Sequence, residues 1–178
     1  EGWVFERELD YSSTNAAAFS ELIIKLGKVT FIPGARYEYM ENTVQGKYSL
    51  NYEIGRQQKN RNVLLFGAAM EYHLNPENEI VVNYNRSFRP ALFSELTPAA
   101  TTDVINPDLK DAQGYNIDAF IRGKVMKSRL HYQLGGYYTL YADKIGNYTL
   151  NGTRYVTNIG DALSKGVEAL LDYRLGLP

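Results

Sequence analysis

The chain has 178 residues, no cysteine and a formal net charge of −1. This length suffices for one ordinary domain, and the lack of cysteine excludes a disulfide framework and thiolate metal sites within it. Charges of both signs are mixed along the chain without a basic stretch, so we expect no nucleic-acid partner. No run of about twenty apolar residues could form a transmembrane helix.

The N-terminal part alternates apolar and polar residues, as strands with one oily and one wet face do. The alternation predicts strands over three ranges: 16–26, 29–40 and 63–74. A short turn is expected at 27–28. Residues 41–62 are polar and predict a long connection, although a weak alternation at Tyr48, Leu50 and Tyr52 leaves open a hairpin that extends there.

The same period continues through the second part of the chain. It predicts strands over 79–88, 114–125, 129–146 and 164–175. The clearest is "GYNIDAFIRGKV", in which Ile117 and Ile121 share one parity and Asn116 and Asp118 the other, with Phe120 an apolar exception on the wet side. A small hairpin is expected over 147–156, because Asn-Gly at 151–152 is a strong two-residue turn signal.

The connections between these strands alternate between short and long. The short ones lie at 27–28, 75–78 and 126–128, and the long ones at 41–62, 89–113 and 143–163. In an up-and-down sheet alternate connections fall at the same end, so one end carries tight turns and the other large polar loops. With strands of about ten residues, this asymmetry is typical of an outer-membrane barrel. We therefore predict an all-β fold, an antiparallel up-and-down meander of about seven main strands that forms part of a large transmembrane β-barrel.

The chemistry of the two faces agrees with a barrel wall. The oily face would meet lipid and the wet face a hydrated lumen. Tyr72, Tyr84, Tyr132 and Tyr173 are expected near strand termini, where aromatic girdles lie. The alternative is that tyrosine is simply abundant in half-exposed sheets.

Four stretches resemble, in order, motifs of TonB-dependent outer-membrane receptors of the ferric-citrate-receptor type. The matching residues are Pro33, Gly34, Arg36, Tyr37 and Glu38; Tyr84, Arg86, Phe88, Arg89 and Pro90; Asn106, Pro107, Leu109 and Lys110; and Asn158, Gly160, Gly166 and Glu168. Asp111 and Ala112 stand where the family usually has Pro-Glu, so a turn contact is expected to be lost. Neither a plug domain nor a TonB box is visible, so we expect 1–178 to be a fragment of the barrel domain without its plug.

The resemblance implies an integral protein of the bacterial outer membrane, in contact with lipid. Such a receptor imports a ferric chelate or siderophore-like nutrient, and TonB energises it through the plug. An isolated fragment is expected to be unable to transport and to self-associate through its open strand edges.

Candidate ligand-binding residues lie on the wet face near the long-loop end: Asn85, Arg89, Asn116, Asp118 and Tyr141. Arg89 could meet an anionic chelate, while tyrosine and asparagine could hydrogen-bond it. The alternative is that they are ordinary lumen residues, paired with neighbours or with a plug.

No metal site, cofactor or catalytic constellation is expected. His73 and His131 are the two histidines of the chain, and without carboxylates at fixed spacing they indicate lumen or solvated histidines. Glu168 and Asp172 share a wet sheet face, which explains them better than acid–base chemistry. Two rival functions remain: a soluble all-β small-ligand or glycan-binding module with its oily face closed inward, and a β-rich enzyme domain such as a glycosidase.

Overall fold

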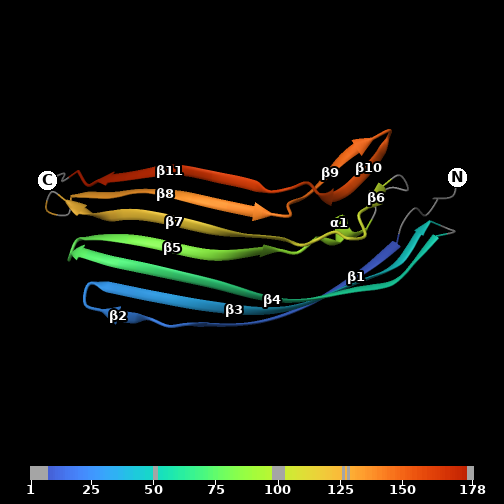
Figure 1. The fold of residues 1–178 in the computed structure, drawn as a ribbon, viewed down its shortest axis with the longest axis horizontal. Helices are drawn as coiled ribbons and strands as arrows, with labels where there is room; N and C mark the ends of the chain where they lie inside the picture. Colours follow the sequence, from blue (N-terminus) through green and yellow to red (C-terminus); the bar gives the residue numbers. More distant parts are fainter. Residues whose placement is uncertain (1–7, 50–51, 98–102, 126, 128, 176–178) are drawn as a thin grey trace.

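The computed structural model describes residues 8–49, 52–97, 103–125, 127 and 129–175. A long antiparallel sheet follows the order β1-β3-β4-β5-β7-β8-β11, with β2 paired to β3 alone (Figure 1). Its strands are β1 (Glu8–Glu21), β2 (Ile24–Leu26), β3 (Val29–Ser49), β4 (Tyr52–Asn75), β5 (Asn78–Arg89), β7 (Ala112–Val125), β8 (Leu130–Ala142) and β11 (Ala162–Tyr173). A second sheet joins β6 (Asp103–Ile105), β10 (Thr153–Asn158) and β9 (Ile145–Leu150), and one short helix, α1, spans Phe93–Leu96. The predicted all-β meander and its main strands are confirmed.

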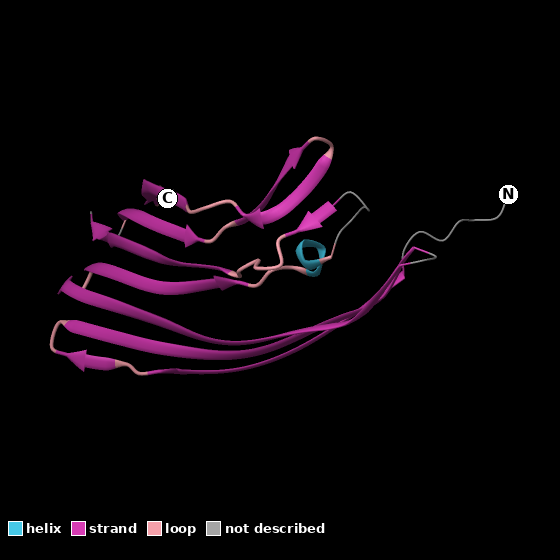
Figure 2. Ribbon diagram, turned by 45° about the vertical axis from the view of Figure 1, so that its right-hand side comes forward, coloured by secondary structure: helices cyan, strands magenta, loops and turns pink. Residues whose placement is uncertain are grey.

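The two ends of the long sheet differ as the connections predicted. The turns joining β2 to β3, β4 to β5 and β7 to β8 lie at one end, here called the turn end (left in Figure 1). The helix, the small sheet and the tips of β3 and β4 lie at the other, the loop end. In the described residues no ladder joins the edge strands β1 and β11, so the sheet forms an open, curved wall (Figure 2).

Apart from 50–51, which lie outside the described residues, 41–62 are strand, so the long connection expected there is wrong and the alternative, a hairpin that extends there, is confirmed. The ladder between β3 and β4 continues to Ser49 and Tyr52, with register shifts between Val44 and Gly46 and between Lys47 and Ser49. A backbone ladder needs no alternation of apolar and polar side chains, so it persists where the alternation is weak. The expected hairpin over 147–156 is confirmed, with Asn151 and Gly152 at φ of 50° and 79° as the turn requires.

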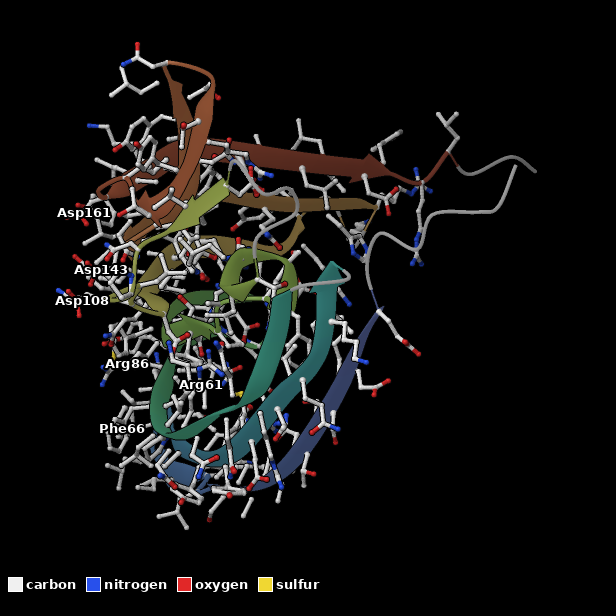
Figure 3. All side chains as sticks on the ribbon, turned by 90° about the vertical axis from the view of Figure 1, so that its right-hand side faces the viewer. Arg61, Phe66, Arg86, Asp108, Asp143 and Asp161 are labelled. Carbon is white, nitrogen blue, oxygen red and sulfur yellow. The ribbon has the colours of Figure 1, made fainter. Side chains whose placement is uncertain are left out.

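The strand register places apolar side chains in continuous rows across the convex face. One row joins Ile80, Ile121, Leu134 and Ala169, and the next joins Val82, Ala119, Gly136 and Val167. Leu134 is 56 % exposed, and no large side chain of the described residues is fully buried. A soluble module would need these side chains in a sealed interior, which this wall does not provide. Figure 3 shows Phe66 and Arg86 pointing outward from the same convex side.

Tyrosines border these rows at two levels. Tyr72 and Tyr132 lie near the turn end, as does Tyr173 at the end of β11. The prediction is wrong for Tyr84, which lies near the middle of β5. Its ring centroid is 6.2 Å from that of Tyr115, which is 6.1 Å from that of Tyr138. Tyr84 thus belongs to an aromatic series that crosses the wall nearer the loop end.

Phe120 interrupts the wet face for a packing reason. A Cβ built on Gly135 would come within 2.4 Å of the Phe120 Cβ. A Cβ built on Gly166 would come within 2.9 Å of the Tyr137 side chain. The Arg122 guanidinium carbon lies 5.6 Å from the centroid of the Phe120 ring, within cation–π range. Phe120 and Tyr137 on the concave face therefore lie against glycines of the neighbouring strand, where a Cβ would not fit.

Candidate functional site

A ladder of polar side chains crosses β5, β7 and β8 on the concave face. Asn85 is paired in register with Asn116, and Asn83 with Asp118. The Asp118 carboxylate accepts hydrogen bonds from the Asn83 Nδ2 at 2.6 Å and from the Asn116 Nδ2 at 2.7 Å. Thr139 Oγ1 donates to Asn116 Oδ1 at 2.5 Å. Charge-assisted bonds of this kind hold the carboxylate in one orientation.

A shallow depression of about 240 Å³ lies beside this ladder. Its lining includes Asn116, Asp118, Gln133, Tyr137 and Glu168. Glu168 is paired in register with Gly135, which brings a second carboxylate to the depression from β11. The sequence analysis placed Glu168 on the wet face but did not bring it to this site, because its neighbours depend on strand register.

The other two candidate residues lie closer to the loop end of the same face. Tyr141 stands two residues beyond Thr139 on β8 and is 40 % exposed. Arg89 is engaged by α1, because its Nη2 donates to Glu95 Oε1 at 2.7 Å. The other oxygen of Glu95 accepts the Leu92 backbone N–H at 2.8 Å. The structure therefore gives Arg89 a part in anchoring the helix.

The segment with α1 folds over the concave side of the wall (Figure 2). Tyr11 of β1 contacts it: its ring centroid is 4.7 Å from that of Phe93, and its hydroxyl lies 3.2 Å from Thr97 Oγ1. A small apolar core beneath this segment joins it to the β9–β10 hairpin through Ala91, Leu109, Ile145 and Val156. Residues 90–97 and 103–111 thus lie over the concave side of the wall at its loop end.

The family follows from a match over nearly the whole chain. A model described as "TonB dependent receptor-like, beta-barrel" matches residues 6–178. The chain belongs to the TonB-dependent receptor β-barrel family. No curated protein matches it. Within the described ranges no helix is both long and apolar enough to span a bilayer.

Solved structures share the fold of this receptor wall at low sequence identity. It is similar to the ferric-catecholate import receptor Fiu from E. coli K12, at 13 % identity and a TM-score of 0.65, covering 90 % of this chain and 26 % of that one. The FrpB iron transporter from Neisseria meningitidis is 15 % identical with a TM-score of 0.71, and the match covers 95 % of this chain and 25 % of that one. The copper transporter OprC is 17 % identical with a TM-score of 0.74, and the match covers 93 % of this chain and 26 % of that one. The chain thus spans about a quarter of these proteins, which, like the family, are transport receptors and not enzymes.

Two motifs that carried the resemblance contact one another in the receptor wall. Asn158 Nδ2 donates to the Lys110 carbonyl at 3.0 Å and to the Asp143 carbonyl at 2.6 Å, and Asn158 Oδ1 accepts the Lys110 backbone N–H at 2.9 Å. Asn106 Nδ2 donates to Thr157 Oγ1 at 3.0 Å. These bonds hold the connection before β7 against the β9–β10 hairpin.

Asp111, at the departure from the family pattern, forms contacts of its own. Its Oδ2 accepts from Arg61 Nε at 2.6 Å and its Oδ1 from the Ala91 backbone N–H at 2.8 Å. Lys59 Nζ lies 3.9 Å from Oδ1. Burial by itself would raise the pKa of Asp111, but the hydrogen bonds from Arg61 and Ala91 and the two positive charges hold the pKa below its ordinary value. The Arg61–Asp111 ion pair, with the bond to Ala91, thus holds the described parts of this segment, 90–97 and 103–111, against the long β3–β4 hairpin.

Proposed function

We propose that the protein carrying this chain is an outer-membrane active-transport receptor that imports a ferric chelate of the siderophore class, energised through TonB. The family match over residues 6–178 supports the receptor class. Three solved proteins of the same fold are named a ferric-catecholate import receptor, an iron transporter and a siderophore receptor. A copper transporter shares the fold equally well, so the fold alone does not identify the substrate. The iron chelate is therefore the part of the proposal that needs a direct test.

The observation that carries the membrane part of the proposal is the division of side chains between the two faces. Rows through Leu134 and Val167 are apolar on the convex side, and the Asn85–Asn116–Asp118 ladder is polar on the concave side. A barrel wall in a membrane needs this division of side chains, because its outer face meets lipid and its inner face meets water. Its backbone groups must also be paired, which a closed sheet achieves. The convex face would contact lipid of the outer membrane.

The polar ladder is the proposed ligand-binding surface. Asn85, Asn116, Asp118 and Tyr141 offer amide, carboxylate and hydroxyl groups toward the lumen, and Arg89 lies nearest the loop end. An anionic chelate would meet the Arg89 guanidinium first, and hydroxyl or amide hydrogens of the chelator could then bond Asp118. The order of these contacts follows from the position of Arg89 beyond Asn85 on β5.

Asp118→Ala is expected to weaken chelate binding about tenfold, the effect of losing one charge-assisted hydrogen bond and loosening the ladder around it. The measurement is the affinity of the full receptor in detergent for radioiron-labelled ferric catecholate, ferric hydroxamate and ferric citrate. Asp172→Ala is the matched control, because Asp172 shares the concave parity but pairs with His131 near the turn end. Equal affinities for both variants would refute the assigned site.

Transport itself is tested in cells that depend on this receptor for iron. Uptake of the labelled chelate should stop when TonB is removed or the proton gradient is collapsed, while binding at the surface persists. Uptake that continues without TonB would refute the proposed energy source, whatever the outcome for Asp118.

The isolated chain is expected to self-associate, because β1 and β11 offer unpaired backbone groups along fourteen and twelve residues. Sedimentation velocity in detergent below and above its critical micelle concentration would measure the effect, with oligomers or aggregates expected without micelles. A monodisperse, detergent-free monomer would contradict the proposal.

A further inference from the structure

Two carboxylates and a histidine converge on the concave face at the turn end. Glu71 and His73 stand two residues apart on β4, so they share a face. The β4–β5 register then sets Glu79 directly opposite His73. The sequence analysis set the histidines aside for want of carboxylates at fixed spacing, and the strand pairing supplies those carboxylates.

The ligand atoms of this cluster lie close together. His73 Nδ1 is 3.1 Å from Glu79 Oε2, and His73 Nε2 is 4.0 Å from Glu71 Oε2. One atom from each of the three residues can be chosen so that all lie within 4.8 Å of one another. Ligands of a tetrahedral zinc ion, bound at about 2.0–2.2 Å, lie roughly 3.3–3.5 Å apart. A metal ion binds one imidazole nitrogen, whereas Glu79 faces Nδ1 and Glu71 faces Nε2, so one of the two carboxylates must turn toward the nitrogen that the other faces to complete a three-ligand set.

Arg122 and Thr30 contact the ligand residues from outside the ligand set. Arg122 Nε donates to Glu79 Oε1 at 2.5 Å, which leaves Oε2 turned toward His73. The hydroxyl of Thr30, a residue only 7 % exposed, lies 3.5 Å from His73 Nε2. Bonds of this kind from outside the ligand set fix the orientation of metal ligands in proteins. The hollow of about 460 Å³ beside His73 and Glu79 leaves room for a water ligand.

We propose that Glu71, His73 and Glu79 form a binding site for a divalent first-row transition-metal ion, with water completing the coordination. An imidazole with two carboxylates suits Zn²⁺ or Fe²⁺ better than Mg²⁺ or Ca²⁺, which favour oxygen ligands alone. The Arg122 charge beside Glu79 opposes a cation, so the site is expected to be exchangeable rather than permanently loaded. It lies at the turn end, away from the proposed chelate ladder, and does not depend on that assignment.

The test is calorimetric titration of the full receptor with ZnCl₂ in detergent at neutral pH, after removal of metal by a chelator. One zinc site is expected to weaken at least about tenfold in His73→Ala and in Glu79→Gln. His131→Ala is the matched control, since His131 is the other histidine of the chain, and its affinity should stay within about twofold of the parent.

Cobalt absorption supplies a readout independent of heat and of activity. Co²⁺ added to the metal-free receptor should give visible ligand-field bands that disappear in His73→Gln, a variant that keeps a polar side chain of similar length. Heat-modifiable migration on gels checks that each variant is folded. A folded His73→Gln receptor with unchanged cobalt bands and unchanged zinc affinity would overturn the proposal, as would a parent receptor that binds neither ion.

Discussion

Leu134→Arg is expected to destabilise the folded receptor in lipid by about 2–4 kcal/mol. Leu134 lies in the convex row between Ile121 and Ala169, and its side chain is 56 % exposed on that face. If this face contacts acyl chains, a guanidinium here is either buried in hydrocarbon or stabilised by water and lipid headgroups that distort the bilayer locally. Both arrangements cost free energy. Urea unfolding of the full receptor in lipid vesicles, followed by tryptophan fluorescence, measures the change.

Gln133→Arg is the matched control for that substitution. Gln133 is the preceding residue on β8 but faces the lumen side, where it pairs with Arg122 and Leu170. Repulsion from Arg122 is expected to cost less than about 1 kcal/mol. Equal destabilisation by the two arginines would mean that the convex face does not lie against lipid.

Asp111→Ala is expected to release residues 90–97 and 103–111 from the β3–β4 hairpin, with a local cost of about 3 kcal/mol. The cost is large because the Arg61 side chain is only 4 % exposed and would keep its charge without the carboxylate that now bonds Nε. Hydrogen exchange of the backbone amides of 90–111 should accelerate by roughly 100-fold. Asp108→Ala, which removes an exposed carboxylate of the same segment, should leave the exchange rates near those of the parent.

The Arg61–Asp111 ion pair also makes the stability of the loop end depend on pH in the acid range. Because the folded-state pKa of Asp111 lies below its ordinary value of 3.8, the carboxylate stabilises the closed segment at all pH values above the unfolded pKa. This contribution is lost as the pH falls below about 4 and through the folded pKa. Exchange protection of 90–111 should therefore be flat from neutral pH to about 5 and should fall on further acidification. Asp111→Asn should remove that acid dependence, and a parent-like acid profile in this variant would contradict the assignment.

A closed segment at the loop end bears on the proposed transport. Tyr11 holds α1 on the concave side through Phe93 and Thr97, so α1 lies on the proposed lumen side of the loop end. Arg89 is tied to Glu95 of the same helix, and a ligand that attracts the guanidinium would compete with the helix for it. Arg89 thus links the proposed binding surface to α1.

Alternation and connection length determined the architecture without any tertiary information. Ile117 and Asp118 had to face opposite ways because successive strand residues do, and the sorting of short turns and long loops predicted the two unlike ends. Residues 41–62 showed only a weak alternation, at Tyr48, Leu50 and Tyr52, which left open both a long connection and an extended hairpin.

Contacts between strands were decided only by the tertiary structure. The length and geometry of the turn at 75–78 decide which residues of β5 stand opposite His73 and Ala69. A slip of one residue in this register would change the partner of every residue in the two strands. The same holds for Asp111, whose partner Arg61 lies fifty residues away in the chain. The sequence by itself therefore determined the faces of each strand, whereas the groups that meet across strands follow from backbone hydrogen bonds whose register no local pattern encodes.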